Sequence, residues 1–169
     1  GEMTGLHWIA ESGFLEGPVV STNTHSIGAA HEGALLWQRD NHYHEGGLAA
    51  LPVIAETWDG FLNDINGFHL RPHHAASALA GAKSGPVAEG NVGGGTGMVC
   101  YRFKGGIGTA SRVFSVDGQD YTLGALVQAN FGRRKDLTVR GHPIGELLKG
   151  QYLRESGAES IGEGNSLLC

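Results

Sequence analysis

Histidines are the first residues in this sequence whose type and spacing suggest chemistry, because imidazole nitrogens are common metal ligands. The nine histidines include the pair His42 and His44 and the group His69, His73 and His74. Neither set has the helix-borne H-E-x-x-H spacing or the nearby cysteine pair that zinc sites use. A His-x-His pair in a glycine loop is more often simply exposed to solvent. We therefore expect no metal ion.

A glycine-rich loop, GGGTG at residues 93–97, is the second candidate, because such loops can cradle phosphate groups. A P-loop follows a strand and carries a Lys-Ser/Thr pair at the start of a helix. Here the glycines precede an apolar stretch, residues 98–103, and no such pair occurs. The loop is better explained by close packing of backbone, or by N–H groups that line a substrate pocket. No cofactor is expected.

The composition is that of a soluble globular protein of one domain, with 169 residues, of which 40% are apolar and 17% charged. The formal charge of −5 and the pI of about 6.0 argue against nucleic-acid binding, which usually needs a basic surface. The one basic cluster, Arg133-Arg134-Lys135, is interpreted as a solvated turn.

The sequence gives no sign of a membrane anchor, because no apolar run approaches the roughly 18 residues of a transmembrane helix. Residues 1–5 lack the regions of a signal peptide and do not look like a natural translation start. Cys100 and Cys169 form neither a disulfide framework nor a metal spacing. Both the cytoplasm and the periplasm stay open as compartments, and we expect the sequence to be truncated at both ends.

Elements of the first half follow from apolar spacing and turn residues. The 29 glycines cluster between apolar runs without a period, which favours a β-rich protein with tight turns. The spacing of residues 27–40 predicts a helix, with Ser26 as its N-cap. The other expected elements are a strand over 17–24, a loop over 41–47, a strand over 51–55, a turn over 63–67, and a helix that starts at Pro72 and closes at Gly85-Pro86.

The clearest element of the second half is a hairpin. Asp117-Gly118 lies between the apolar runs 111–116 and 121–127, and its residues suit the positive φ angles of a primed turn. The other expected elements are strands over 98–103 and 137–139, a short helix over 144–149, a flexible linker over 150–164, and an apolar triplet near the end that looks like the start of another strand.

Three stretches, taken together and in this order, resemble the family of self-processing serine aminopeptidases that includes the L-aminopeptidase D-Ala-esterase/amidase DmpA and the β-aminopeptidase BapA. The resemblance runs from about residue 2 to residue 149 and resumes at Asn165-Ser166. The stretches are LPVIAETWDG (51–60) with NDINGFH (63–69), AEGNVGGGTG (88–97) followed by KGGIGTASR (104–112), and GALVQANFG (124–132).

The resemblance implies an α+β fold, the αββα four-layer sandwich of N-terminal-nucleophile hydrolases. The sandwich would be incomplete here, because the family's downstream piece supplies central strands. Residues 1–149 would form part of the hydrolase domain (the α-subunit portion), residues 150–165 a flexible processing linker, and residues 166–169 the start of the truncated downstream β-subunit. Family members cleave themselves just before a serine, which implies cleavage between Asn165 and Ser166.

Ser166 is implied to be the nucleophile. A cut in a mobile linker lets the backbone adopt the strained turn that attack by a hydroxyl on its own peptide carbonyl requires. After the cut, Ser166 would carry a free α-amino group with a reference pKa of about 7.7–8.0, which can accept the hydroxyl proton at neutral pH. Without the family resemblance, Ser166 would be interpreted as the first residue of a strand.

Three further residues stand at positions that have a role in the family. Asn130 matches an asparagine whose side-chain amide helps to bind the oxyanion, which can contribute roughly 3–4 kcal/mol to the barrier. Glu56 matches an acidic residue that binds the free amine of the substrate, so that the enzyme distinguishes a chain end. Trp58 departs from the pattern, since a relative carries a tyrosine there, and tryptophan has a donor N–H but no acceptor hydroxyl. Each residue also has an alternative interpretation. Asn130 could be a strand-end asparagine that holds a turn, Glu56 a surface carboxylate, and Trp58 a pocket wall.

Together these residues predict an autoproteolytically activated serine aminopeptidase or amidase that releases N-terminal amino acids from short peptides, amides or esters. Its partners would be its own downstream β-subunit, these substrates, and further copies in a homo-oligomer. The fragment alone is expected to be inactive. Two alternatives stay open: an acyltransferase similar to the ornithine acetyltransferases, which use threonine after the cut, and a non-catalytic relative that has lost self-processing.

Overall fold

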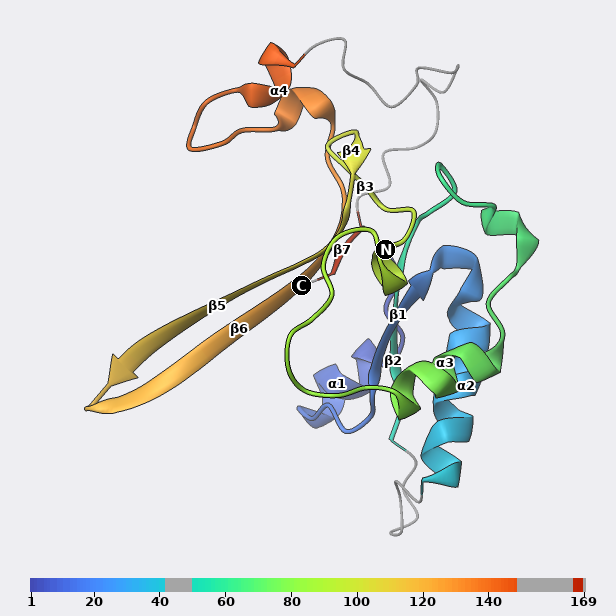
Figure 1. Cartoon of the computed structure of the whole chain (residues 1–169). Coiled ribbons are helices and arrows are strands. Elements are labelled where there is room, and N and C mark those ends of the chain that lie inside the picture. Colours follow the sequence, from blue (N-terminus) through green and yellow to red (C-terminus); the bar gives the residue numbers. More distant parts are fainter. Residues whose placement is uncertain (42–49, 149–165, 169) are drawn as a thin grey trace. The chain divides into compact units, whose positions relative to one another are not determined.

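The computed structural model describes residues 1–41, 50–148 and 166–168, and in the last range only the backbone. The chain divides into two compact units, Gly1–Pro86 and Val87–Cys169. Both units contain helices as well as strands, so the chain is α+β, as predicted (Figure 1).

The first unit consists of a pair of parallel strands with helices before and after them. Its elements are α1 (Leu6–Ser12), β1 (Val19–Asn23), the 3-10 helix η1 (Thr24–Ser26), α2 (Ile27–Asp40), β2 (Val53–Thr57), the 3-10 helix η2 (Ile65–Gly67) and α3 (Pro72–Ala80).

Strand β2 has neighbours on both of its edges. All five of its residues pair in parallel register with β1. On its other edge, Met3 forms an antiparallel bridge to Ala55, and the N–H of Glu56 donates to the carbonyl of Glu2 at 3.0 Å. The strand is therefore covered from both sides, and every residue in it is buried.

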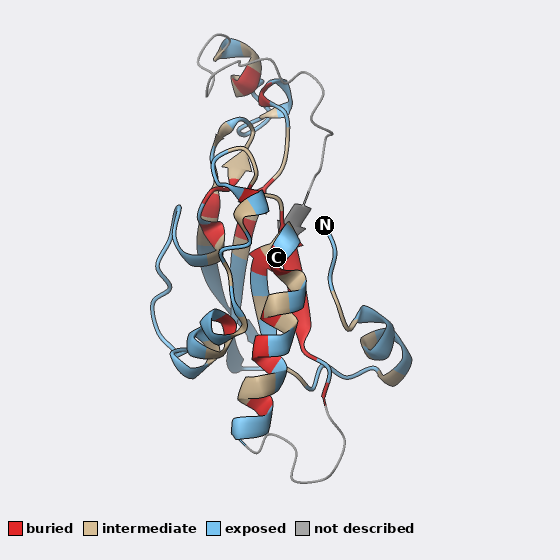
Figure 2. Cartoon of the chain, turned by 90° about the vertical axis from the view of Figure 1, so that its right-hand side faces the viewer, coloured by how far each residue is buried: buried red, intermediate tan, exposed pale blue. Residues whose placement is uncertain are grey.

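The core of this unit lies between β2 and the helices α2 and α3. Figure 2 shows that α2 has a buried stripe and an exposed face. Gly33 on this stripe allows the helices to approach closely, since a Cβ added there would lie 2.1 Å from the carbonyl oxygen of Pro72. The buried core residues are Ala30, Ala34, Ile54 and Ala75. Small side chains on both helices thus set a short distance between them.

The expected elements of this unit are largely found, with differences at their ends. Helix α2 has the predicted bounds, but the Ser26 side chain makes no capping hydrogen bond, because its φ of −108° and ψ of 8° continue the preceding turn. Strand β2 starts and ends two residues after the prediction, since its pairing begins when the N–H of Val53 donates to the carbonyl of Pro18. Helix α3 ends at Ala80 rather than near Gly85. The predicted loop 41–47 lies almost entirely outside the described residues, and α1 was not predicted.

The second unit is dominated by a long antiparallel hairpin, drawn from yellow to orange in Figure 1. Its elements are the 3-10 helix η3 (Gly93–Gly95), β3 (Val99–Cys100), β4 (Phe103–Lys104), β5 (Gly106–Val116), β6 (Gln119–Asn130), the 3-10 helix η4 (Arg134–Asp136), α4 (Ile144–Leu147) and β7 (Ser166–Leu168).

Strand β6 is the middle strand of a three-stranded sheet with the order β5-β6-β7. The predicted hairpin is confirmed, since Asp117 and Gly118 form its two-residue loop with φ angles of 50° and 78°, both positive as a type I′ turn requires. The predicted terminal strand is also found, because β7 pairs antiparallel with the end of β6.

Two strand predictions in this unit were wrong. The apolar stretch 98–103 is not one strand but two strands of two residues each, since Tyr101 and Arg102 both take positive φ angles and reverse the chain. Residues 137–139 form no strand; only Val139 makes an isolated bridge to His142. Helix α4 starts where predicted, and the predicted linker lies outside the described residues.

The glycine-rich loop packs backbone against backbone, which is the first of the two predicted explanations. The N–H of Gly90 donates to the carbonyl of Ile107 at 2.8 Å, and the N–H of Ile107 donates back at the same distance. A Cβ at Gly95 would lie 2.8 Å from the carbonyl oxygen of Gly90, and one at Gly106 would lie 2.0 Å from it. Side chains at these positions would therefore force the loop away from β5.

A pair of glycine substitutions in α2 tests the close helix packing. We expect Gly33→Ala to lower the free energy of unfolding by about 1–3 kcal/mol, because its methyl group would overlap Pro72 and Ala75. Gly28→Ala is the matched control on the same helix, since its Cβ would meet no described atom within 4 Å. Alanine there should raise stability by up to about 1 kcal/mol through helix propensity. Urea unfolding of the full-length protein measures both; equal effects would contradict the packing.

Candidate active site

The residues predicted to form the site fall in both units. Asn130 and Ser166 belong to the second unit, where the structure brings their backbones together, and Glu56 and Trp58 belong to the first. Asn165, the other residue of the predicted cleavage bond, lies outside the described residues.

Asn130 is the last residue of β6 and is only 6% exposed. Its Oδ1 accepts a hydrogen bond from the backbone N–H of Val99 at 3.0 Å. Because a backbone N–H can only donate, this contact assigns the oxygen of the amide. The donor atom Nδ2 is then on the other arm of the amide. Through this bond the side chain holds the neighbouring segment that contains Val99.

Ser166 is the register partner of Asn130 in the ladder between β6 and β7. Directly opposed residues of antiparallel strands have α-carbons about 4.5–5.5 Å apart and share one face of the sheet. The pairing continues to Leu167 and Leu168, opposite Ala129 and Gln128. The backbone of this unit therefore places a serine beside a buried amide.

Glu56 lies within β2 and is buried, which excludes the alternative of a surface carboxylate that follows a strand. The residue is 6% exposed. Oε1 accepts from the backbone N–H of Glu2 at 2.8 Å, and Oε2 accepts from the hydroxyl of Thr24 at 2.5 Å. Each carboxylate oxygen has a second lone pair, so the group can still bind a cation. A carboxylate with little water around it attracts an ammonium group more strongly than one on the surface.

The segment after Glu56 is held by a second buried carboxylate that the sequence analysis missed. Asp59 is 5% exposed and accepts from Nδ2 of Asn63 at 2.9 Å and from Nδ2 of Asn23 at 3.3 Å. Trp58 is half-buried, and its indole lies over Gly60, where a Cβ would be 2.7 Å from the ring. In the sequence, the only sign that Asp59 is held in this way was the presence of two asparagines, Asn23 and Asn63, near expected turns.

Arg134 was also misjudged, because the cluster Arg133-Arg134-Lys135 was interpreted as a solvated turn. The turn exists as η4, and Arg133 is exposed and pairs with Asp136 at 2.8 Å. Arg134, however, is 3% exposed. Arg133 and Lys135 are exposed while Arg134 between them is buried. Because all three residues are basic, the sequence does not show which of them is buried.

The histidines are dispersed among the described residues. No group of three histidine, cysteine, aspartate or glutamate side chains in the described part of the chain could hold a metal ion. The rings of His73 and His74 lie 4.0 Å apart, and Nε2 of His69 lies 3.3 Å from Oδ2 of Asp64. His42 and His44 lie outside the described residues. None of the helices that the structure describes has the length and apolar character needed to cross a membrane.

The architecture and the sequence together define the class of this chain. It is similar to L-aminopeptidase D-Ala-esterase/amidase from Ochrobactrum anthropi, a prototype for the serine aminopeptidases and a variant of the Ntn hydrolase fold, with a TM-score of 0.85 and 52% identity over 90% of this chain and 43% of that one. The chain therefore has part of an Ntn hydrolase fold, as predicted. The model of peptidase family S58 matches residues 1–168, and the chain belongs to that family.

Two further relatives agree with this assignment. The β-peptidyl aminopeptidase BapA of Sphingosinicella microcystinivorans is 56% identical over 156 residues, which is 92% of this chain and 39% of BapA. A β-aminopeptidase from Burkholderia sp. has a TM-score of 0.80 and 53% identity over 88% of this chain and 42% of that one. The chain thus spans about two fifths of the length of these relatives. These comparisons give no support to the acyltransferase alternative.

Cys100, which follows Val99 on β3, gives a prediction about pH. Partial burial raises the pKa of its thiol above the ordinary value, against the weaker opposite effect of a hydrogen bond with the backbone of Phe131. A raised pKa means less thiolate at a given pH, so alkylation by iodoacetamide should be slower than for free cysteine between about pH 7 and 9. Peptide mapping by mass spectrometry measures the rate at this residue. The prediction would be contradicted if the pH midpoint of the alkylation rate lay at or below that of free cysteine. It would also be contradicted if unfolding in urea did not speed alkylation.

Proposed function

We propose that this chain is the upstream part of a self-cleaving serine aminopeptidase or amidase, which releases N-terminal amino acids from short peptides, amides or esters. The observation that carries the proposal is the register pair of Asn130 and Ser166, in a chain that family S58 matches almost from end to end. The activities named for its relatives, a β-peptidyl aminopeptidase and an L-aminopeptidase D-Ala-esterase/amidase, support this class of reaction.

The first step is cleavage of the chain itself. The hydroxyl of Ser166 attacks the carbonyl carbon of Asn165, the C–N bond between them breaks, and the acyl group moves from nitrogen to oxygen. Water then hydrolyses the ester. The products are a carboxylate on Asn165 and a free amine and hydroxyl on Ser166. In this proposal residues 1–149 are part of the hydrolase domain, 150–165 a processing linker, and 166–169 the start of the downstream subunit.

The second step uses the new amine as a base. It accepts the proton of the Ser166 hydroxyl while the oxygen attacks the substrate carbonyl, and it then donates that proton to the departing amine. Nδ2 of Asn130 donates to the oxygen on which negative charge develops, and its fixed orientation supports this role. Water hydrolyses the resulting acyl-enzyme ester and releases the amino acid.

Glu56 is proposed to bind the ammonium group of the substrate. Its burial and its two ordered hydrogen bonds support a carboxylate held in one orientation, which favours a chain end over an interior peptide bond. Trp58 would form a wall of the same pocket, so the preference among L, D and β-amino residues depends on its indole. The remaining partners are the downstream subunit and further copies of the protein.

Processing is the decisive test. The full-length protein should appear as two pieces, one of which begins at Ser166, and Ser166→Ala should appear as one intact chain without aminopeptidase activity. Intact mass and N-terminal sequencing measure this. An intact wild-type chain, or an alanine variant that still trims peptides, would defeat the mechanism and favour a non-catalytic relative.

A substitution at Glu56 tests the amine site. We expect Glu56→Gln to raise KM for amino-acid amides with a free amine, since a hydrogen bond to a charged group contributes about 1.5–3 kcal/mol, or roughly 10–150-fold. Glutamine keeps an oxygen for the N–H of Glu2 and so preserves the packing. Glu32→Gln, on the exposed side of α2, is the matched control and should change nothing. If both variants bind substrate like the wild type, the carboxylate of Glu56 is not the amine site.

A further inference from the structure

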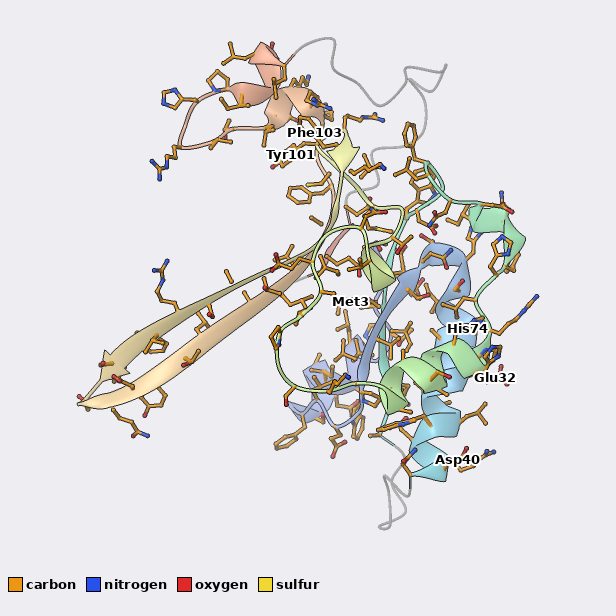
Figure 3. All side chains as sticks on the ribbon, viewed as in Figure 1. Met3, Glu32, Asp40, His74, Tyr101 and Phe103 are labelled. Atoms are coloured by element: carbon orange, nitrogen blue, oxygen red, sulfur yellow. The ribbon has the colours of Figure 1, made fainter. Side chains whose placement is uncertain are left out.

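Arg134 is a buried cation in the unit that carries Asn130, and the mechanism proposed above leaves it without a role. It begins η4 and is 3% exposed. Its Cζ lies 3.3 Å from the centroid of the Phe103 ring. Figure 3 labels Phe103 and Tyr101 at the β3–β4 hairpin, which this guanidinium contacts. Burial of a permanent charge is unfavourable unless the charge is hydrogen-bonded, so its contacts indicate what it stabilises.

The guanidinium binds both carbonyls of a strained turn. Nε donates to the carbonyl of Tyr101 at 2.8 Å, and Nη2 donates to the carbonyl of Arg102 at 2.6 Å. These two residues form the whole loop between β3 and β4, with φ angles of 49° and 62°. Such a loop normally takes asparagine and glycine, because a Cβ disfavours positive φ. Arg134 therefore supplies hydrogen bonds to a turn that its own residues do not favour.

The same turn holds Asn130. The N–H of Val99, two residues before the loop, donates to Oδ1 of Asn130. The N–H of Tyr101 donates to the carbonyl of Phe131 at 2.8 Å, and the two rings pack edge to face with centroids 5.0 Å apart. Because β3 has only two residues, the position of its N–H groups depends on the turn that follows. A displaced turn would draw the Val99 N–H away from Oδ1 and so weaken the hold on the amide of Asn130.

We propose that Arg134 is a positioning residue for the oxyanion site. It holds the turn of Tyr101 and Arg102, and through that turn and Val99 it fixes the direction in which Asn130 presents Nδ2. The inference rests on the function proposed above for Asn130. Arginine suits this task because its planar fork can bind two adjacent carbonyls while its face stacks on a ring, and a lysine ammonium cannot do both.

The test uses the full-length protein, with kcat referred to the amount of serine titrated by a serine-reactive probe. We expect Arg134→Met to lower kcat by about tenfold or more and to leave KM within about twofold, because the lost interaction matters in the transition state. Arg134→Lys should fall between this variant and the wild type. Arg133→Met is the matched control on the same turn, since it removes an exposed ion pair with Asp136 and should leave kcat unchanged.

Two double variants separate positioning from a merely structural role. If Arg134 acts through Asn130, Arg134→Met should cost less than about a further twofold in an Asn130→Ala background, because the two effects share one route. If it acts by holding the turn, Arg102→Gly should restore much of the kcat that Arg134→Met loses, because glycine accepts the positive φ without help.

Each outcome decides the proposal. With a wild type that is processed and active, three results would overturn it. The first is a kcat loss from Arg134→Met that is as large in the Asn130→Ala background as in the wild type. The others are a rise of KM with unchanged kcat, and failure of Arg102→Gly to restore kcat. Where a substitution slows self-cleavage, the same comparisons are made on the rate at which the new N-terminal serine appears. A wild type that neither cleaves itself nor hydrolyses amino-acid amides would defeat the proposed function, and this inference with it.

Discussion

The hydrogen bond from the backbone N–H of Val99 to Oδ1 of Asn130 is the contact on which the candidate oxyanion site depends. An asparagine amide has one acceptor arm and one donor arm, and rotation of its last bond exchanges them. A backbone donor removes this ambiguity, because it can bind only the oxygen. Asn130 is also the last residue of β6 and the register partner of Ser166, the first residue of β7. The direction of its donor is therefore fixed next to the backbone of that serine.

Very close packing around the end of β6 is the constraint that allows Asn130 to be held in this position. Gly132 follows the Asn130-Phe131 pair with a φ of 85°, and a Cβ there would lie 2.5 Å from Cε1 of Tyr101. Gly105 adjoins the same strand, where a Cβ would lie 2.3 Å from the carbonyl oxygen of Ala129. At Gly105 and Gly132 glycine is thus a steric requirement, because segments on both sides of the strand end pack at distances that leave no room for a side chain.

Local elements could be predicted from the sequence, but their contacts could not. Helix α2 and the Asp117-Gly118 hairpin were found because spacing and turn residues encode them within a few positions. The 98–103 stretch misled, because its apolar residues fit a strand while a guanidinium from elsewhere in the chain stabilises a reversal at Tyr101 and Arg102. Asn130 and Ser166 could be named from the family resemblance. Their supports could not, since Val99 and Arg134 act across 31 to 33 residues of sequence.

Glu56 and Asn130 show the same physical arrangement in two separate units. Each is a buried polar side chain in a strand, and each gives one or more acceptor sites to a backbone N–H. For both, the backbone bond lowers the cost of burial and fixes the orientation of the group before any ligand arrives. A binding group prepared in this way loses little conformational freedom when a substrate binds. The hydrogen bonds that stabilise the fold would therefore also be those that orient the site, which is why a substitution that weakens them should affect reaction rate as well as stability.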